Sequence, residues 1–270
     1  MKQTNYTIDI EDISNIAIAA GKAIMNIYET FDNKIEYKKD NSPLTQADKI
    51  ANEIICMELK RLTPNIPILT EESEQAPFAV RKNWERYWCI DPLDGTKEFI
   101  NKNGEFTVNI AYLENNVPIL GVVFAPCLNE LYFAQKDKGA FWCDVLTNET
   151  IKLPISKQDK NTTTIVASRS HLNEQTSQII DRFSQNHRNI QLTSIGSSLK
   201  FCLIAKGEAD FYPRIAPTME WDTAASDAIL RECGKQIYVY HDSFCFANLK
   251  KEKTITYNKQ SLLNPSFLVL

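Results

Sequence analysis

The residues best suited to chemistry stand in the segment DPLDGT, residues 91–96, directly after the apolar run YWCI, 87–90. Such a run places two carboxylates at the mouth of a buried strand, where a proline and a glycine shape a tight turn. Asp91, Asp94 and the Leu93 carbonyl then converge, and crowded carboxylates repel each other unless protons or a cation neutralise them. Hard oxygen ligands suit Mg²⁺, and a helix opening after the glycine turns its first amides toward an anion. The segment predicts a magnesium site that handles phosphate.

Two more acids stand where they could complete such a site. Glu71 follows a short predicted strand over 67–70, and Asp222 begins a predicted helix in the segment WDTAA, residues 221–225. Taken alone, a carboxylate at a helix start is usually a cap or a dipole partner, and paired glutamates after a strand are usually solvated. Their role as ligands therefore rests on the whole constellation.

The first half of the chain supplies the elements that must hold these acids. Helical spacing of apolar residues predicts a helix over 9–29. Thr45 and Asp48 form a capping-box pattern that begins a second helix. Two apolar runs, 106–113 and 117–124, predict an antiparallel hairpin. The remaining expectations here are strands at 131–133 and 140–142 and a polar loop at 73–86.

A polar stretch at 147–161 is the candidate boundary between two subdomains, 1–150 and 151–270. Beyond it strands and helices alternate, which is typical of an α/β arrangement. The predicted strands are 164–167, 189–192 and 209–212, and the predicted helices begin near 172 and 197 and cover 221–231. We therefore expect an α+β first half that carries most of the metal ligands and an α/β second half that completes the site.

The composition is that of a folded protein, because 43% of the 270 residues are hydrophobic and 24% are charged. A net charge of −4 gives no bulk field that would attract a nucleic-acid polymer or an anionic membrane. An anionic small molecule must then be bound by a few local groups. No apolar run approaches the ~20 residues that span a bilayer. The seven cysteines are scattered and form no CxxC pair, which indicates reduced thiols in a cytoplasmic setting.

A series of motifs carries a family resemblance across almost the whole chain. In order they are DNSPLTQAD, DPLDGTKEF, NGEFTVNIA, PILGVV, SRSH, SIGSSLKFCL, WDTAA and LNPSF. With them the sequence resembles the inositol monophosphatase superfamily of metal-dependent, lithium-sensitive phosphatases, and within it the bacterial 3'(2'),5'-bisphosphate nucleotidases. The resemblance implies an α/β fold, a layered αβαβα sandwich of the sugar-phosphatase type.

The resemblance also implies roles for single residues. Thr96 and Asp48 would orient the attacking water, with the carboxylate accepting its proton. From the residues alone, Asp48 is also read as a helix cap beside Thr45; the two roles are compatible, and the presence of Thr96 favours the catalytic one. Asp91 would bridge two Mg²⁺ ions, with room for a third, looser ion. The implied metal ligands are Glu71, Asp91, the Leu93 carbonyl, Asp94 and Asp222.

A bisphosphorylated nucleotide needs a second anchor away from the metals, which Arg and Lys commonly supply. From periodicity alone, Lys200 and Arg214 would be surface charges and His171 a residue at a helix start. The motifs SRSH and SIGSSLK reverse that preference. By resemblance, the substrate contacts are Glu71, Leu93, Asp94, Gly95, Thr96, His171, Gly196, Ser197, Lys200, Arg214 and Asp222.

The implied reaction is hydrolysis of the 3'-phosphate of 3'-phosphoadenosine 5'-phosphate to AMP and phosphate, which would remove a by-product of sulfate assimilation. The implied location is the cytoplasm, either free or peripheral at the cytoplasmic face of the inner membrane. Two alternatives stay open: a phosphatase of the same fold for inositol monophosphate or fructose bisphosphate, and a nucleotide-binding regulator without catalysis. Glu220 departs from the family pattern as an added acid just before Trp221, which leaves the metal affinity open.

Overall fold

Alternation of side chains along the strands gives the central sheet two buried faces. In β5 (Thr107–Glu114), for example, Val108 and Ile110 pack on one side while Ala111 and Leu113 pack on the other. The sheet has the order β3-β4-β5-β6-β7-β8-β9, with β3 parallel to β4 and the other pairs antiparallel. Its other strands are β3 (Ile68–Thr70), β4 (Arg86–Asp94), β6 (Val117–Ala125), β7 (Glu130–Gln135), β8 (Gly139–Asp144) and β9 (Glu149–Lys152). This computed structural model describes residues 8–30, 36–37, 43–155, 161–167, 174–185 and 189–270.

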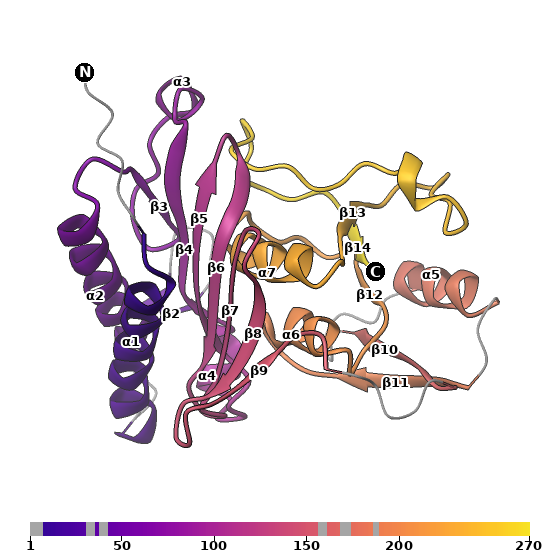
Figure 1. Ribbon diagram of the computed structural model, residues 1–270, viewed down its shortest axis with the longest axis horizontal. Helices are drawn as coiled ribbons and strands as arrows, with labels where there is room; N and C mark the ends of the chain where they lie inside the picture. Colours follow the sequence, from indigo (N-terminus) through magenta and orange to yellow (C-terminus); the bar gives the residue numbers. More distant parts are fainter. Residues whose placement is uncertain (1–7, 31–35, 38–42, 156–160, 168–173, 186–188) are drawn as a thin grey trace.

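Two long helices, α1 (Ile10–Thr30) and α2 (Gln46–Leu62), cover one face of this sheet (Figure 1). Ile13, Ala17 and Ile24 recur at helical spacing in α1 and are buried against the sheet residues of the same core cluster. Burial of this stripe, together with the buried apolar residues of α2 in the same cluster, holds both helices against the sheet as an outer layer.

The opposite face is covered by α6 (Leu199–Lys206) and α7 (Trp221–Glu232). The contact between α7 and β6 is unusually close, because a Cβ atom at Gly121 would stand 2.1 Å from the Ala225 carbonyl oxygen and 2.9 Å from the Ala228 Cβ. Glycine is therefore required at this position of β6. Main-chain contact here sets the height of α7 above the sheet.

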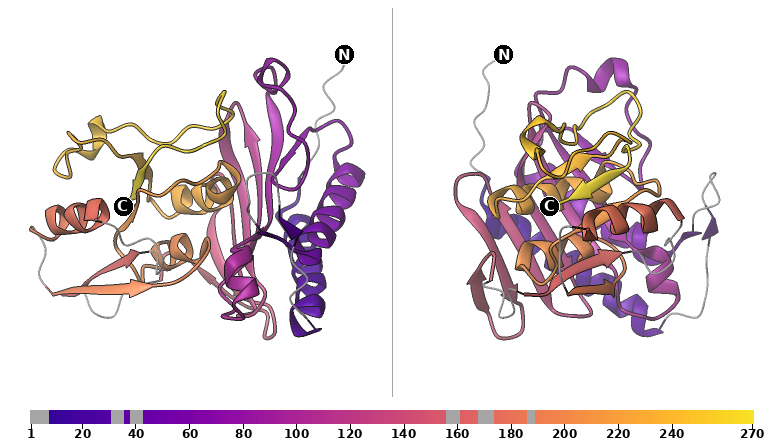
Figure 2. Two further views of the ribbon diagram at one scale, coloured as in Figure 1. Left: turned by 180° about the vertical axis from the view of Figure 1, so that it is seen from behind. Right: turned by 90° about the vertical axis from the view of Figure 1, so that its right-hand side faces the viewer.

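A second layer of strands lies beyond α6 and α7. It contains the parallel pair β10 (Thr163–Ala167) and β11 (Ile190–Ser194) and the antiparallel set β12 (Tyr212–Arg214), β14 (Phe267–Val269) and β13 (Ile237–Val239). The Val166 N–H donates to the Phe211 carbonyl at 2.9 Å and joins the two groups edge to edge. Helix α5 (Glu174–Ser184) packs on their outer side through Ile179 and Phe183. Figures 1 and 2 show the resulting order helices, sheet, helices, strands, helix, which confirms the predicted αβαβα sandwich.

The short elements hold most of the differences from expectation. Helix α3 (Phe78–Arg81) interrupts the segment predicted as a polar loop, and β9 extends the large sheet into the stretch predicted as a boundary. The strand predicted at 209–212 is observed as β12, at Tyr212–Arg214. The other short elements are β1 (Glu36–Tyr37), β2 (Pro43–Leu44), α4 (Thr96–Ile100) and the 3₁₀ helix η1 (Leu249–Lys251). The division into subdomains 1–150 and 151–270 stays a prediction.

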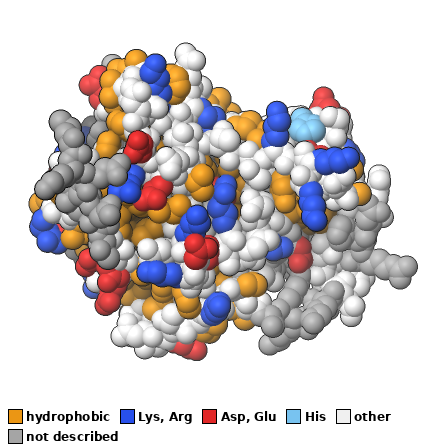
Figure 3. Space-filling model, turned by 45° about the horizontal axis from the view of Figure 1, so that its top comes forward, with side chains coloured by type: hydrophobic (Ala, Val, Ile, Leu, Met, Phe, Trp, Pro, Cys, Tyr) orange, Lys and Arg blue, Asp and Glu red, His pale blue; other side chains and the backbone are white. Residues whose placement is uncertain are grey.

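The surface carries both signs of charge. Basic and acidic side chains are interspersed with apolar ones over the described part of the face in Figure 3. Within the described ranges, no helix combines the length and the apolar character needed to cross a membrane.

Candidate active site

An irregularity in β4 brings its two aspartates to one face of the sheet. Asp91 lies opposite Asn109 of β5 and Asp94 lies opposite Thr107, so β4 holds one residue more than β5 between the two pairs. In a regular strand, side chains three residues apart point to opposite faces. The bulge corrects this parity and lets Asp91 and Asp94 share the face that α6 and α7 cover. The sequence motif predicts the two acids, whereas the pairing with β5 explains why they converge.

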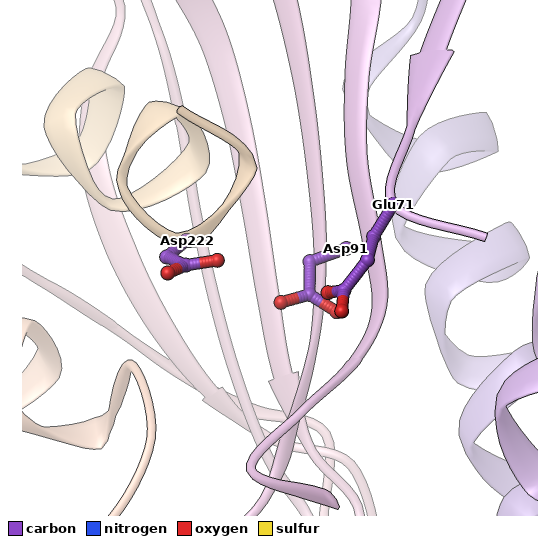
Figure 4. Close-up of side chains that lie close together, drawn as sticks. All are labelled: Glu71, Asp91 and Asp222. Carbon is purple, nitrogen blue, oxygen red and sulfur yellow. The ribbon is translucent and has the colours of Figure 1, made fainter. Parts of the chain in front are cut away.

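Three carboxylates form a compact group at this edge. One oxygen from each of Glu71, Asp91 and Asp222 lies within 4.8 Å of the others. Glu71 follows β3, and its N–H donates to the Ile90 carbonyl at 3.2 Å, which holds it beside Asp91. Asp222 reaches the group from the first turn of α7 on the opposite side, as Figure 4 shows, with its Oδ2 accepting the Met219 N–H at 2.9 Å. The structure therefore unites three of the predicted ligands from both halves of the chain.

Crowding and burial shift the protonation of this group. Burial raises the pKa of the Asp91 carboxyl well above its usual range, and the charges of Glu71, Asp94 and Asp222 raise it further. Burial also raises the pKa of Asp222, with Asp94 and Glu71 adding to the effect and the Met219 N–H opposing it. A divalent cation relieves the same repulsion without protons. An all-oxygen set of this kind fits Mg²⁺.

The other two predicted ligands lie next to this group. The Leu93 N–H donates to Asp91 Oδ1 at 3.0 Å, and the Leu93 carbonyl accepts from Thr96 Oγ1 at 3.4 Å. Among the described residues, Asp94 stands outside the group of three. Its Oδ2 instead accepts hydrogen bonds from the hydroxyls of Ser197 and Ser198, both at 2.7 Å.

Asp48 connects the start of α2 to the aspartate segment. Its Oδ2 accepts from the Thr45 N–H at 2.7 Å and from Thr45 Oγ1 at 2.6 Å, which completes the predicted capping box. Its Oδ1 accepts from Thr96 Oγ1 at 3.1 Å. Asp48 is buried, with 1% of its surface exposed. The helix-cap arrangement is confirmed, and the predicted Thr96 partnership is present beside it.

A cleft of about 330 Å³ opens beside the carboxylates. Predicted residues form much of its wall, and several unpredicted ones join them. The predicted lining residues are Glu71, Asp94, Gly95, Thr96, Ser197, Lys200, Arg214 and Asp222. The unpredicted ones are Lys97, Glu98, Phe201, Tyr212, Pro217 and Thr218. The cleft therefore presents both carboxylates and the basic side chains of Lys200 and Arg214.

Lys200 is held firmly at the cleft. Its Nζ donates to the carbonyls of Ile195 at 3.2 Å and Ser197 at 2.7 Å, which leaves one of its three protons for a ligand. Burial lowers the pKa of Lys200 to about 8, although the Asp94 carboxylate acts in the opposite direction. Arg214 is likewise tied to the main chain, through Nε to the Ala216 carbonyl at 3.1 Å.

His171 and Gly196 are predicted substrate contacts that are not among the described residues lining the cleft. His171 lies outside the described residues altogether. Gly196 is not among the lining residues; its N–H donates to Glu105 Oε2 at 2.8 Å, and a Cβ there would stand 2.7 Å from the Glu98 side chain. The close approach at Gly196 is therefore to Glu98 and Glu105 within the protein.

Glu220 has a structural explanation that its sequence position does not reveal. It is fully buried, and its carboxylate accepts from the Asn258 N–H at 2.6 Å and from Lys259 through both N–H (2.9 Å) and Nζ (2.6 Å). These contacts anchor the start of α7 to the segment after η1. Glu220 is thus a tether for the helix that carries Asp222, and its charge is met by Lys259.

The model of the inositol monophosphatase family matches residues 6–266. The chain belongs to this family. The sequence resemblance is thereby confirmed.

Within the inositol monophosphatase family, the chain is similar to proteins of several bacteria. It is 42% identical over 263 residues to the 3'(2'),5'-bisphosphate nucleotidase CysQ of Salmonella typhimurium, covering 96% of this chain and 98% of that protein. The corresponding protein of Escherichia coli K12 is 40% identical over 262 residues, with the same coverage.

Solved structures of the inositol monophosphatase family share the fold. The crystal structure of CysQ from Bacteroides thetaiotaomicron has a TM-score of 0.83 and 41% identity, with 98% of each chain covered. The IMPase of Thermotoga maritima has a TM-score of 0.70 and 25% identity, covering 96% of this chain and 90% of that one.

Proposed function

We propose that the chain is a Mg²⁺-dependent 3'(2'),5'-bisphosphate nucleotidase that hydrolyses the 3'-phosphate of 3'-phosphoadenosine 5'-phosphate to AMP and phosphate. The observation that carries the proposal is the group of Glu71, Asp91 and Asp222 next to a cleft that also presents Lys200 and Arg214. Similarity to the Salmonella and Escherichia nucleotidases over nearly the full length supports the substrate class.

The carboxylate group is the proposed metal site. Glu71, Asp91 and Asp222 would hold Mg²⁺, with Asp94 and the Leu93 carbonyl beside them. When bound, Mg²⁺ would polarise the phosphoryl oxygens and make the attacking water more acidic. The raised pKa values of Asp91 and Asp222 support this assignment, because a bound cation would stabilise the charged carboxylates against the burial and repulsion that raise those values.

Thr96 and Asp48 would accept the proton of the attacking water in sequence. Thr96 Oγ1 donates to Asp48 Oδ1, so its oxygen lone pairs remain able to accept from a water. As that water attacks phosphorus, its proton passes to Thr96 and the hydroxyl proton of Thr96 passes to Asp48. The bond from phosphorus to the 3' oxygen breaks, and this oxygen takes a proton from solvent.

Lys200 and Arg214 would hold the second phosphate in the same cleft. Lys200 and Arg214 both line the cleft, and both side chains are fixed by main-chain carbonyls. Such preorganised donors bind an anion with little loss of side-chain freedom.

The proposal is tested by phosphate release from 3'-phosphoadenosine 5'-phosphate, inositol 1-phosphate and fructose 1,6-bisphosphate, with Mg²⁺ and then with added Li⁺. We expect fast, lithium-inhibited release from the nucleotide. Preference for a sugar phosphate would reject the nucleotide assignment but keep the metal chemistry. Absence of turnover on all three would instead favour a nucleotide-binding regulator.

Substitution of Lys200 separates nucleotide from sugar specificity. Lys200→Ala should lower kcat/KM for the nucleotide by about tenfold or more, since a hydrogen bond to a charged group contributes about 1.5–3 kcal/mol. Turnover of inositol 1-phosphate should fall less, because it loses only the support that Lys200 gives to the turn at Ser197 and not a phosphate contact. Lys206→Ala is the matched control, because Lys206 lies in the same helix but pairs with Glu130 and Glu208. Equal losses on both substrates would contradict the role of Lys200.

A further inference from the structure

Two adjacent serine hydroxyls donate to the same oxygen of Asp94. Asp94 Oδ2 accepts from Ser197 and Ser198, which form the turn into α6. Ser197 has a left-handed φ of 54°, an uncommon conformation for serine that surrounding contacts must maintain. Lys200 Nζ holds the turn through the carbonyls of Ile195 and Ser197. The turn at Ser197 and Ser198 therefore holds the Asp94 side chain.

Ser198 is oriented toward Asp94 by the strand opposite. Asn109 Nδ2 donates to Ser198 Oγ at 3.0 Å, while Asn109 Oδ1 accepts from Thr107 Oγ1 at 3.1 Å. The Ser198 hydroxyl accepts from Asn109 through a lone pair, and this contact does not use the single hydroxyl proton. Ser198 can therefore donate that proton to Asp94. The Asp222 carbonyl lies 3.2 Å from the same hydroxyl. Ser198 thus touches β5, the end of β4 and the start of α7.

Burial separates Ser198 from the substrate. Ser198 and Asn109 each expose 1% of their surface, and neither is among the residues lining the cleft. Ser197, in contrast, does line the cleft. A role for Ser198 in the reaction must therefore pass through the side chain that it holds.

We propose that Ser198, oriented by Asn109, is a positioning residue for Asp94 that fixes Oδ2 and leaves Oδ1 for the metal ion. The proposal rests on the metal-dependent function proposed above. Partners that orient a metal ligand typically change metal affinity by about 10–100-fold when they are removed. Ser198 would act in the same way on Asp94.

The first test is binding of Mg²⁺ alone to the substrate-free protein, measured by isothermal titration calorimetry. Ser198→Ala should raise the Kd for Mg²⁺ about tenfold or more. The matched control is Ser226→Ala, because Ser226 is also a buried serine and its hydroxyl has no hydrogen-bond partner among the described residues. Its Kd should stay within about twofold of the parent value. An unchanged Kd in Ser198→Ala would overturn the proposal.

A double-mutant cycle tests whether Ser198 acts through Asp94. Once Asp94→Asn has removed the charged oxygen, adding Ser198→Ala should change the Kd by less than about twofold. An equal loss in the parent and in the Asp94→Asn background would overturn the proposal.

A variant that keeps the hydroxyl separates loss of the contact from loss of folding. If Ser198→Ala does not fold, Ser198→Thr should fold and keep the Kd within about threefold, and a tenfold loss in a folded Ser198→Thr would count against the hydroxyl contact. Failure of the parent protein itself to bind Mg²⁺ would reject the proposed metal-dependent function. Normal binding by the parent with no effect of Ser198→Ala would reject the positioning role alone.

Discussion

Asp48 uses different oxygens for the helix cap and for the proposed proton transfer. Oδ2 caps α2 by accepting from Thr45, and Oδ1 accepts from Thr96. The two functions can therefore be separated by substitution.

Asp48→Asn should lower kcat for the nucleotide by about 10²–10⁴-fold, because an amide cannot accept the proton of the attacking water. KM should change little, and α2 should persist, since the amide oxygen of asparagine can still accept from the Thr45 N–H. Steady-state kinetics and thermal unfolding check both points. Thr45→Ala is the control: it should cost about 1 kcal/mol of stability and leave kcat nearly intact. A full rate in Asp48→Asn would reduce Asp48 to a cap.

Asp91 is the residue whose ionisation opposes folding when no metal is present. Its folded-state pKa is raised by burial and by neighbouring acids, so its stabilising contribution is complete below pH 3.8 and is lost as the pH rises through the raised value. Asp91→Asn should therefore unfold at a higher temperature than the metal-free parent at pH 8, while its turnover is abolished.

Magnesium should reverse this order. At 100 times its Kd, Mg²⁺ should stabilise the parent by about 2.7 kcal/mol and leave Asp91→Asn nearly unchanged. Asp137→Asn, an exposed acid in the turn between β7 and β8, should respond to Mg²⁺ as the parent does. Full activity in Asp91→Asn would be incompatible with the proposed site.

At the scale of elements, α7 carries both Asp222 of the proposed metal site and a second buried acid, Asp227. Asp227 is fully buried, with Arg231 Nη2 3.0 Å from its Oδ2. Burial raises the pKa of Asp227 to about 6, although Arg231 acts in the opposite direction. The folded protein thus holds a proton between about pH 4 and pH 6 that the unfolded chain has released.

The stability difference between the parent and Asp227→Asn should therefore fall by up to about 3 kcal/mol as the pH rises from 4 to 7. Denaturant unfolding of both proteins at a series of pH values, without metal, measures this difference. A difference that does not depend on pH would show that Asp227 keeps an ordinary pKa. Asp137→Asn again serves as the exposed control.

Local patterns in the sequence were sufficient to predict the helices and strands that carry the predicted ligands. The cap at Thr45 and the strand ending near Asp91 depend on neighbours in the chain, and both are found where expected. The bulge opposite Asn109 and the hydroxyl of Ser198 were missed, because their significance arises from pairing between distant segments. For the same reason Glu220 looked like an addition to the acidic site, although Lys259 neutralises it.

At the scale of the whole molecule, the site exists because α7 is seated on the large sheet. Glu71, Asp91 and Asp94 come from the sheet, whereas Asp222 comes from the helix. Gly121→Ala should push the helix outward, since the added Cβ would overlap the Ala225 carbonyl. We expect a stability loss of about 1–3 kcal/mol and a kcat/KM lowered by about 10²-fold.

Gly21→Ala is the matched control, measured by the same kinetics and unfolding. A Cβ at Gly21 of α1 would overlap the Phe124 ring of the same strand β6, on the face away from the site. It should destabilise the protein with little effect on kcat. If both variants lose activity equally, the height of α7 is not what the site depends on.

The close contact at Gly121 also bears on which ion the protein accepts. Mg²⁺ prefers oxygen ligands at about 2.0–2.1 Å, whereas Ca²⁺ takes them at about 2.3–2.6 Å. To accommodate the larger ion by separating Asp222 from Asp91, the protein would have to lift a helix whose main chain already rests on a strand. In the proposed metal site, this packing contact would therefore favour Mg²⁺ over Ca²⁺, although no proposed ligand residue takes part in it.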